Sequence, residues 1–280
     1  MITINLMGGT GNQLFQWAFG RALESKGNKV QFSPRYITNC LARCYMLEPL
    51  GLNLKLNYPV PGSQRIDENG LEYKPEMLNR EGDLEFHGYW QCERYFKHIE
   101  TNLRNEIKLG LNASQYAIEM ANRIQSSDVS AFIHIRRSDN LARRAVIFHG
   151  ILGQDYYNNA LDIIRSHHGV RIFVFSDDTE WIKANMKDPD MTIVETPWSG
   201  IVRSDNEIEA RSGQGREHED LWLMSLCRHG ITANSTFSWW GAWLGDTDPT
   251  GRAIITPKKW FTEKAGVSSI DIVPSRWMRI

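Results

Sequence analysis

The second half of the chain alternates short apolar runs with segments of helical spacing, and this alternation constrains the fold more than any other feature. The runs suited to strands lie at residues 131–135, 170–175, 192–194, 231–233 and 253–255. Helical spacing fills the intervals at residues 155–167, 179–186, 217–229 and 236–244. Strands that alternate with helices predict a parallel sheet with helices on both faces. We therefore predict an α/β fold with a doubly wound parallel sheet.

The N-terminal half predicts a second, less regular α/β unit. Ile2–Leu6 is a β-rich run, a glycine turn follows, and residues 12–26 have the spacing of a helix. The proline-containing stretch 34–83 predicts loops, short helices and at most one strand, whereas residues 91–108 are expected to be mostly helical. We expect two domains, residues 1–127 and residues 128–280, with the last helix a candidate to pack back on the first domain.

Composition and charge narrow the class of protein. The 280 residues include 32 Lys and Arg against 33 Asp and Glu, which argues against nucleic acid as a partner. The four cysteines form no CxxC pair and no zinc-type spacing, so we expect reduced thiols. With no signal-like N-terminus and no run of eighteen apolar residues, we expect a cytoplasmic protein without a transmembrane segment.

Polar segments follow four of the predicted strands. These segments are Gly8–Gln13, Arg136–Asp139, Ser176–Asp178 and Asn234–Ser238. Because ligands of open α/β sheets bind beyond the carboxyl ends of the strands, we expect these segments to line a ligand cleft.

The strongest cluster contains His134, Arg136, Arg137 and Asp139. A guanidinium group offers a planar fork that matches phosphate oxygens. Adjacent residues of a strand point to opposite faces, so we expect one arginine, Arg136, to bind the phosphate while Arg137 supports it. The alternative is a surface pair bridged to acidic neighbours, and His134 fits a hydrogen-bonded core histidine almost as well.

The segment after the strand at 231–233 predicts a second phosphate contact. Backbone N–H groups at a helix N-terminus, with the Ser235 and Thr236 hydroxyls, are suited to holding a phosphate, although an ordinary helix cap explains the same residues. Asp177 is a candidate ligand for a base or ribose, and Asp178 is expected to cap the following helix.

The glycine loop near the N-terminus does not predict an NAD site. Gly9 and Gly11 fit the start of a dinucleotide motif, but Leu14 stands where the third glycine belongs. The loop allows close backbone approach to a ligand, and Asn12 is expected either to bind hydroxyl groups or to cap the helix.

We expect no metal and no cofactor. The pairs Asp188/Asp190 and Asp246/Asp248 resemble metal-binding DxD motifs, yet both lie in turns where aspartate is common. Residues 218–220 (His-Glu-Asp) are expected to form a solvated first helical turn.

Four segments together resemble the α-1,2-fucosyltransferase family. They are Gly8–Gly20, Gly88–Phe96, His134–Asp139 and Asn234–Leu244, and they extend over nearly the whole chain. The resemblance implies a GT-B fold of two Rossmann-like domains, with 1–127 on the acceptor side and 128–280 binding GDP-fucose. It also implies inversion, no metal, and transfer to the 2-hydroxyl of a terminal galactose. The galactose would belong to a free or lipid-linked glycan, and the enzyme would be cytoplasmic and a candidate for peripheral association with the inner membrane.

The resemblance also assigns roles to residues of this chain. Arg136 binds the diphosphate, which Ser235, Thr236 and Phe237 surround, while Asn12 lies in the loop that faces acceptor and fucose. The remaining donor-binding candidates are Gly9, Gly11, His134, Arg137, Asp177 and Asn234. Asp139 is the candidate base for the acceptor hydroxyl.

The chain departs from the family at three positions. Thr10, Trp17 and Ser138 stand where the family commonly has Leu, Tyr and Gly, which bears on acceptor placement and on the turn after Arg137. Two other functions are compatible with the sequence. One is another inverting sugar-nucleotide transferase, such as one similar to protein O-fucosyltransferases, and the other is a non-catalytic glycan-binding protein that stacks tryptophan on sugar.

Overall fold

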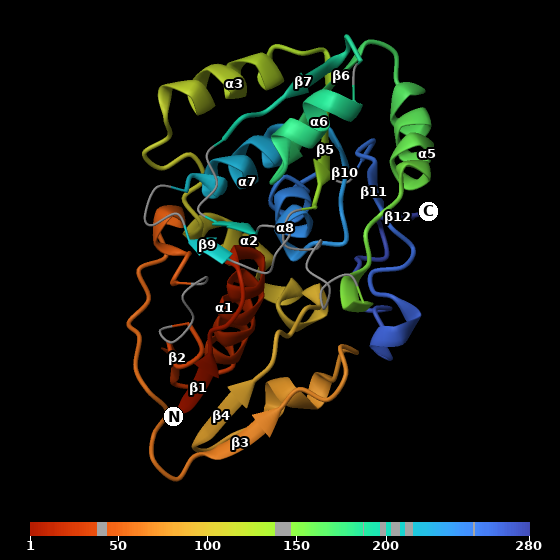
Figure 1. The fold of residues 1–280 in the computed structure, drawn as a ribbon. Helices are drawn as coiled ribbons and strands as arrows, with labels where there is room; N and C mark the ends of the chain where they lie inside the picture. The colour runs from red at the N-terminus through yellow and green to blue at the C-terminus, as the bar shows by residue number, and fades with distance from the viewer. Residues whose placement is uncertain are drawn as a thin grey trace. The chain divides into compact units, whose positions relative to one another are not determined.

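The chain divides into two compact units in the computed structural model, which describes residues 1–37, 44–137, 147–186, 188–196, 200–202, 208–210, 215–248 and 250–280 (Figure 1). Unit 1 contains Met1–Leu111 and Val267–Pro274, and unit 2 contains Asn112–Gly266 and Ser275–Ile280. The sequence placed the boundary after residue 127. The segment that joins unit 1 late in the chain is Val267–Pro274, which contains neither helix nor strand.

Unit 1 is built on a parallel four-stranded sheet with the order β2-β1-β4-β3. Its strands are β1 (Ile2–Asn5), β2 (Val30–Ser33), β3 (Gln64–Asp67) and β4 (Leu84–His87). Its helices are α1 (Thr10–Ser25), η1 (Glu48–Leu50), η2 (Pro75–Asn79), η3 (Glu93–Tyr95), η4 (Lys97–Ile99) and α2 (Glu100–Glu106). The expected helix at 91–108 is therefore largely wrong, since two 3-10 turns precede a seven-residue helix.

Helix α1 packs closely on this sheet through its buried face. A Cβ atom at Gly20 would lie 2.6 Å from the Phe32 ring, so glycine permits the close approach of α1 to β2. On the same helix, Phe19 stacks on Trp90 at 4.6 Å and meets Phe86 and Tyr95 edge-on. An aromatic cluster thus forms the core of unit 1, as expected for most rings of this chain.

Unit 2 contains a parallel six-stranded sheet with the order β12-β11-β10-β5-β6-β7. Its strands are β5 (Val129–Ile135), β6 (Val170–Ser176), β7 (Met191–Ile193), β10 (His229–Ile231), β11 (Ile254–Thr256) and β12 (Met278–Arg279). A separate antiparallel pair consists of β8 (Gly200–Val202) and β9 (Ile208–Ala210). The predicted parallel α/β architecture is confirmed.

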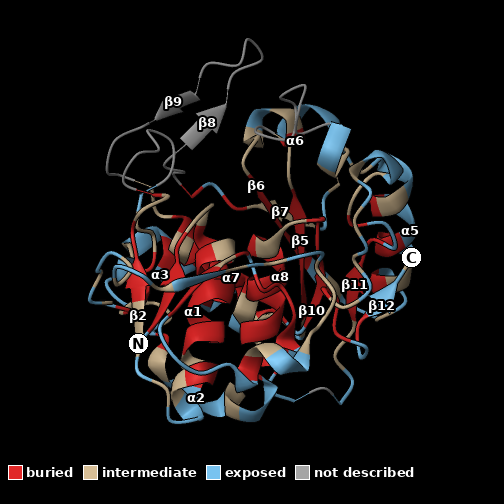
Figure 2. Ribbon diagram, turned by 90° about the horizontal axis from the view of Figure 1, so that it is seen from below, coloured by how far each residue is buried: buried red, intermediate tan, exposed pale blue. Residues whose placement is uncertain are grey.

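Helices accompany this sheet as the alternating pattern predicts. They are α3 (Gln115–Gln125), α5 (Gln154–Arg165), α6 (Thr179–Asn185), α7 (Glu217–Leu226), α8 (Thr236–Leu244) and η6 (Glu263–Ala265). Residues of α5 and α6 form one hydrophobic core with Ala131, Ile133 and Ile135 of β5. Helix α7 packs against both α3 and α8, and β5, β6 and β10 are buried (Figure 2).

Helix α8 is buried on all sides. Trp239, Trp240 and Trp243 are each 0% exposed, and their rings contact one another at centroid distances of 5.0–6.1 Å. A helix that is apolar around its whole circumference has to lie inside the protein, so its N-terminus is held rigidly.

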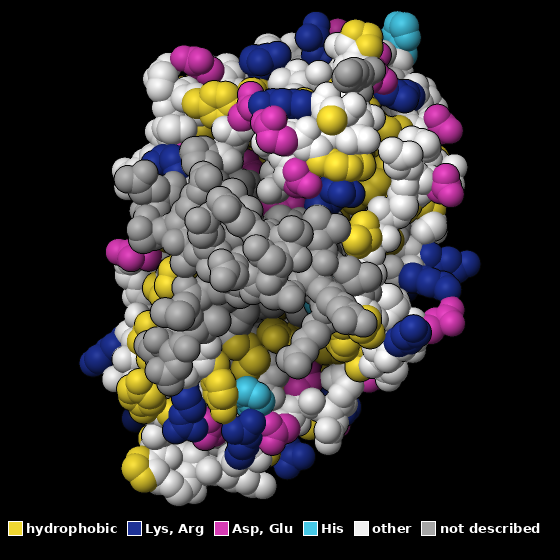
Figure 3. All heavy atoms as spheres, viewed as in Figure 1, with side chains coloured by type: hydrophobic (Ala, Val, Ile, Leu, Met, Phe, Trp, Pro, Cys, Tyr) yellow, Lys and Arg dark blue, Asp and Glu magenta, His cyan; other side chains and the backbone are white. Residues whose placement is uncertain are grey.

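The surface and the thiols agree with the composition. Basic and acidic side chains are interspersed over the described part of one face (Figure 3). Cys44, Cys92 and Cys227 are free thiols, while Cys40 lies outside the described residues. Of the helices that the structure describes, none is long and apolar enough to cross a membrane.

Candidate active site

The carboxyl edge of the unit 2 sheet brings most of the predicted donor-binding residues together. Strands β10, β5 and β6 are parallel neighbours, and Ile135 at the end of β5 lies beside Ser176 at the end of β6. Arg136 and Asp177 therefore leave adjacent strands side by side, and Asn234 follows β10 on the other flank.

Asp177 holds both arginines of the cluster. Its Oδ2 lies 3.2 Å from the Nε of Arg136, and its Oδ1 accepts the backbone N–H of Arg137 at 2.9 Å. The Asp177 side chain is 1% exposed and that of Arg136 14% exposed. A buried charge of this kind needs such a partner, so Asp177 fixes the guanidinium of Arg136. A direct role for Asp177 in binding base or ribose stays a prediction.

Arg137 is bound within unit 2 by acidic and aromatic neighbours. Its Nε lies 3.2 Å from the Asp178 Oδ2, and its guanidinium carbon lies 3.9 Å from the centre of the Trp181 ring. Asp178 also caps α6, since its Oδ1 accepts the N–H of Trp181 at 3.1 Å, and this cap confirms the prediction. Both arginines are thus paired with acidic neighbours, as in the alternative considered for the pair, but their side chains are only 14% and 20% exposed. Trp181 was missed, because helical spacing does not reveal a cation–π contact.

Two tyrosines at the start of α5 form hydrogen bonds with the backbone just after β5 and β10. Neither residue was identified from the sequence. The Tyr157 hydroxyl is hydrogen-bonded to the backbone of Arg136, and the Tyr156 hydroxyl donates to the Thr232 carbonyl at 2.7 Å. Burial raises the pKa of both hydroxyls, so both tyrosines stay neutral at physiological pH. A Tyr-Tyr pair in a first helical turn carries no signal that would have identified these contacts.

Helix α8 begins beside this cluster. Ser235 is its N-cap, because the Ser235 Oγ accepts the N–H of Phe237. The Phe237 ring lies 5.7 Å from the ring of His134, which is 0% exposed. The capping interpretation of Ser235 is confirmed. Capping by Ser235 does not exclude phosphate binding, since a side-chain cap satisfies only part of the N–H groups at a helix start.

Asn234 has a structural task that the sequence did not indicate. Its Nδ2 donates to the carbonyl oxygens of His149 at 2.8 Å and of Trp260 at 3.2 Å. The side chain is 6% exposed. Asn234 thereby fixes two loops near the start of α8.

Unit 1 carries the glycine loop and Asn12. Gly8 has a φ of +75°, and Gly9 is the N-cap of α1 without a side-chain cap. Capping by Asn12 is therefore wrong: the Asn12 Oδ1 accepts from the Gln91 Nε2 at 2.9 Å. Gly11 is buried in the first turn of α1.

The two DxD-like pairs have other roles in the structure. Asp188 pairs with Arg165, and its Oδ1 accepts the N–H of Asp190 at 3.0 Å. Asp246 pairs with Arg276 at 2.5 Å. Within the described ranges, no group of three or more His, Cys, Asp or Glu side chains could hold a metal ion.

Asp139, the candidate base, lies outside the described residues.

The expectation for the first turn of α7 is wrong. Glu219 and Asp220 are each 1% exposed, and the Glu219 carboxylate accepts the backbone N–H of Ser114 at 2.6 Å and its hydroxyl at 2.9 Å. Arg216 pairs with the same carboxylate at 2.6 Å. The acidic turn is buried because it packs against the start of α3.

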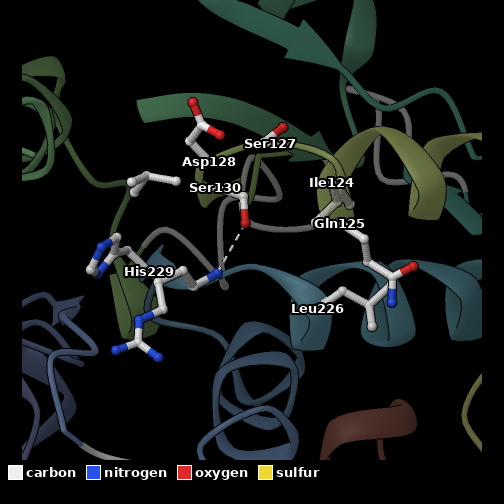
Figure 4. A pocket seen from close by; sticks show the side chains of 9 residues that line it. Ile124, Gln125, Ser127, Asp128, Ser130, Leu226 and His229 are labelled. Atoms are coloured by element: carbon white, nitrogen blue, oxygen red, sulfur yellow. Dashed lines mark hydrogen bonds between the residues drawn. The ribbon is translucent and has the colours of Figure 1, made fainter. Parts of the chain in front are cut away.

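A pocket of about 530 Å³ opens at the opposite edge of the unit 2 sheet (Figure 4). It lies around the amino ends of β5 and β10, where the Ser130 hydroxyl accepts the N–H of Arg228 at 3.1 Å. Ligands of parallel sheets bind at the carboxyl ends, so this pocket is not the predicted cleft.

Comparisons with known proteins show what the chain is similar to. The family described as "Glycosyl transferase family 11" matches residues 82–273. An "Alpha-1,2-colitosyltransferase" of Escherichia coli is 31% identical, over 100% of this chain and 99% of that protein. A "Galactoside alpha-(1,2)-fucosyltransferase 2" of Mus musculus is 25% identical, over 88% of this chain and 70% of that protein.

Solved structures show a similar fold. The crystal structure of NodZ alpha-1,6-fucosyltransferase soaked with GDP-fucose matches with a TM-score of 0.51 at 13% identity. The match covers 87% of this chain and 91% of that chain. At this identity the likeness concerns the fold, which is of the predicted GT-B type.

Proposed function

Because this chain belongs to glycosyl transferase family 11 and is a glycosyltransferase with a nucleotide-sugar donor, we propose that it transfers fucose from GDP-fucose. The acceptor is the 2-hydroxyl of a terminal galactose on a free or lipid-linked glycan, and the transfer inverts the anomeric centre. The observation that carries the proposal is the buried Asp177–Arg136 pair at the carboxyl edge of β5 and β6. The cytoplasmic location expected from the sequence is part of the same proposal.

Arg136 and helix α8 supply the positive charge that the reaction needs. Negative charge grows on the diphosphate as the bond to the sugar breaks, and donors that are already in place stabilise it by about 3 kcal/mol each. Asp177 fixes the guanidinium of Arg136 through its Nε, and the planar guanidinium is the group that we propose binds the phosphate. The start of α8 adds backbone N–H groups on the neighbouring strand end.

The acceptor hydroxyl loses a proton during the transfer. We assign its removal to a carboxylate, with Asp139 as the candidate. Arg136 and the N-terminus of α8 neutralise the diphosphate without a metal ion in this proposal, so it includes full activity in the presence of a chelator.

The full-length similarity to a colitosyltransferase favours GDP-colitose as a second candidate donor. Colitose is fucose without its 3-hydroxyl group, so the same diphosphate contacts serve both donors. Comparing GDP-fucose with GDP-colitose at equal concentration distinguishes the two, because a site built for the 3-hydroxyl discriminates strongly against the sugar that lacks it.

The decisive variant is Arg136→Ala. Loss of one preorganised donor to the developing charge lowers kcat by 10²- to 10³-fold, roughly, while the fold survives. The measurement is GDP release with GDP-fucose and a panel of β-galactosides, with the new linkage identified by NMR. Arg165→Ala is the matched control, because Arg165 also pairs with an aspartate but lies near the surface. Near-normal turnover in Arg136→Ala would contradict the proposal.

A further inference from the structure

The amino edge of the unit 2 sheet contains a buried histidine whose tautomer is fixed by a hydrogen bond. His229, the first residue of β10, is 3% exposed, and its Nδ1 accepts the backbone N–H of Ala253 at 3.0 Å. The accepting nitrogen carries no proton, so the proton of the neutral ring lies on Nε2. A protonated imidazole donates at both nitrogens and has no lone pair for this bond. The bond therefore exists only while His229 is neutral.

This hydrogen bond joins β11 to the centre of the sheet. Ala253 directly precedes β11, and its carbonyl oxygen accepts the N–H of Gly230 at 2.9 Å. Both backbone groups of Ala253 are thus bound by β10. On its other side, β11 pairs with the two-residue strand β12. Loss of the bond to His229 therefore weakens the attachment of β11 at its amino end, where β10 is the longer of its two neighbours.

The surroundings of His229 oppose its protonation. The ring of His167, which follows α5, stacks on it with the ring centres 4.1 Å apart. Burial lowers the pKa of His229 most, and His167, Arg228 on the same strand and Arg252 before β11 lower it further, to about 4. Asp128, a carboxylate that lines the neighbouring pocket, is exposed, so water screens its charge.

The pocket at this edge brings solvent to the buried ring. His229 lines it together with residues at the start of β5 (Figure 4). Its volume of about 530 Å³ is far above the roughly 30 Å³ that one water molecule occupies in the liquid. A proton from bulk water thus reaches the ring as soon as the bond to Ala253 opens.

We propose that His229 is a proton-sensitive latch, which holds β11 on β10 while it is neutral and releases the amino end of β11 when it takes up a proton. In the released form the ring is hydrated and has the ordinary histidine pKa of about 6.5. The released form therefore binds protons more readily than the closed form as the pH falls from 6.5 towards 4. The contribution of the latch to stability is fully present above this window and is lost within it. This inference does not depend on the proposed function.

The test is hydrogen exchange at the Ala253 amide, measured by NMR on the full chain at pH 7 and pH 5. The two pKa values predict that its protection factor falls about 20-fold between these pH values. His229→Asn keeps an acceptor oxygen without a titrating ring, so we expect a change of less than twofold. His168→Asn is the matched control, because it makes the same exchange at an exposed histidine and should keep the fall. The Val194 amide, bonded to Val174 at the far edge of the sheet, reports general acid destabilisation.

The latch is overturned if protection at Ala253 falls no more than at Val194, or if His229→Asn shows the same fall as the wild type. A second measurement decides the matter even where His229→Asn does not fold. It is the NMR titration of the His229 ring in the wild-type protein, for which we expect a pKa well below 6.5 and a proton on Nε2 at neutral pH. A ring that titrates near 6.5, or that carries its proton on Nδ1, contradicts the proposal.

Discussion

At the scale of single residues, Asp177 shows how one buried carboxylate prepares a cation for a ligand. Its two oxygens are bound to a side chain and to a backbone N–H that belong to consecutive arginines. A free guanidinium samples many rotamers, and each lost rotamer costs entropy when phosphate binds. In the proposed function, Asp177 removes that cost before the donor arrives.

Asp177→Asn is therefore expected to weaken GDP binding. The variant loses a charged hydrogen bond worth about 1.5–3 kcal/mol, so we expect the Kd for GDP to rise by about 10- to 100-fold. Isothermal titration with GDP measures the change. Asp188→Asn, which also removes a partner of an arginine, serves as control and should leave the Kd unaltered. An unchanged Kd in Asp177→Asn would show that Arg136 is positioned by other contacts.

Single residues also show what the sequence could and could not predict. The chain order placed Arg136, Asp177 and Asn234 at strand ends, and the structure brings them to one edge. The partners Tyr157 and Trp181 could not be predicted, because each contact joins elements whose packing angle the sequence does not encode. The bond from Ala253 to His229 was missed for the same reason, since β10 and β11 are neighbours only in the folded sheet.

At the scale of elements, hydrophobic periodicity predicted which helices exist better than it predicted whether their residues are buried or exposed. The predicted helix at 217–229 exists as Glu217–Leu226, yet its acidic first turn is buried instead of solvated. Charge in a first turn is the ordinary sign of a helix N-terminus, so nothing local distinguishes a solvated carboxylate from one that anchors another helix. The prediction of a helix at 91–108 was largely wrong, because the spacing of apolar residues does not distinguish 3-10 turns from an α-helix.

Ser114→Ala tests the anchor between α3 and α7. Ser114 caps α3 through the N–H of Ala117 and donates its hydroxyl to Glu219, so the substitution removes a cap and leaves a buried carboxylate less satisfied. We expect a loss of about 1–3 kcal/mol in the free energy of unfolding, measured by urea titration. Ser126→Ala at the other end of α3 removes only an exposed hydrogen bond and should cost less than about 0.5 kcal/mol. Equal losses would contradict the anchor.

At the scale of the whole molecule, the division into units was only partly visible in the sequence. The strand–helix alternation predicted the α/β class and the parallel sheets. A return to the first domain was expected of the last helix, but the irregular segment 267–274 could not be predicted to make it, because its return depends on contacts such as the Asp271 carboxylate with the N–H of Tyr73 at 2.9 Å and with Arg94 at 3.3 Å.

A chain that ends at Gly266 is expected to lose stability in both units. Unit 1 loses the buried Ile272 and Val273, and unit 2 loses Trp277 and strand β12. Each buried apolar side chain contributes about 1.5–3 kcal/mol, so the loss over the two units is comparable with the usual margin of one domain. Differential scanning calorimetry measures it; a melting temperature within about 2 °C of the full chain would show that the C-terminal residues are dispensable.

The chain passes between the two units three times, and this limits how one unit can be exchanged between related enzymes. A chimera that takes unit 2 from a relative needs three junctions, after Leu111, Gly266 and Pro274, and keeps a native octapeptide between two foreign segments. A single crossover after Leu111 replaces residues 267–274 with those of the relative, although these residues belong to the native unit 1. Gene shuffling at one breakpoint is therefore a poor route to new specificity in this scaffold.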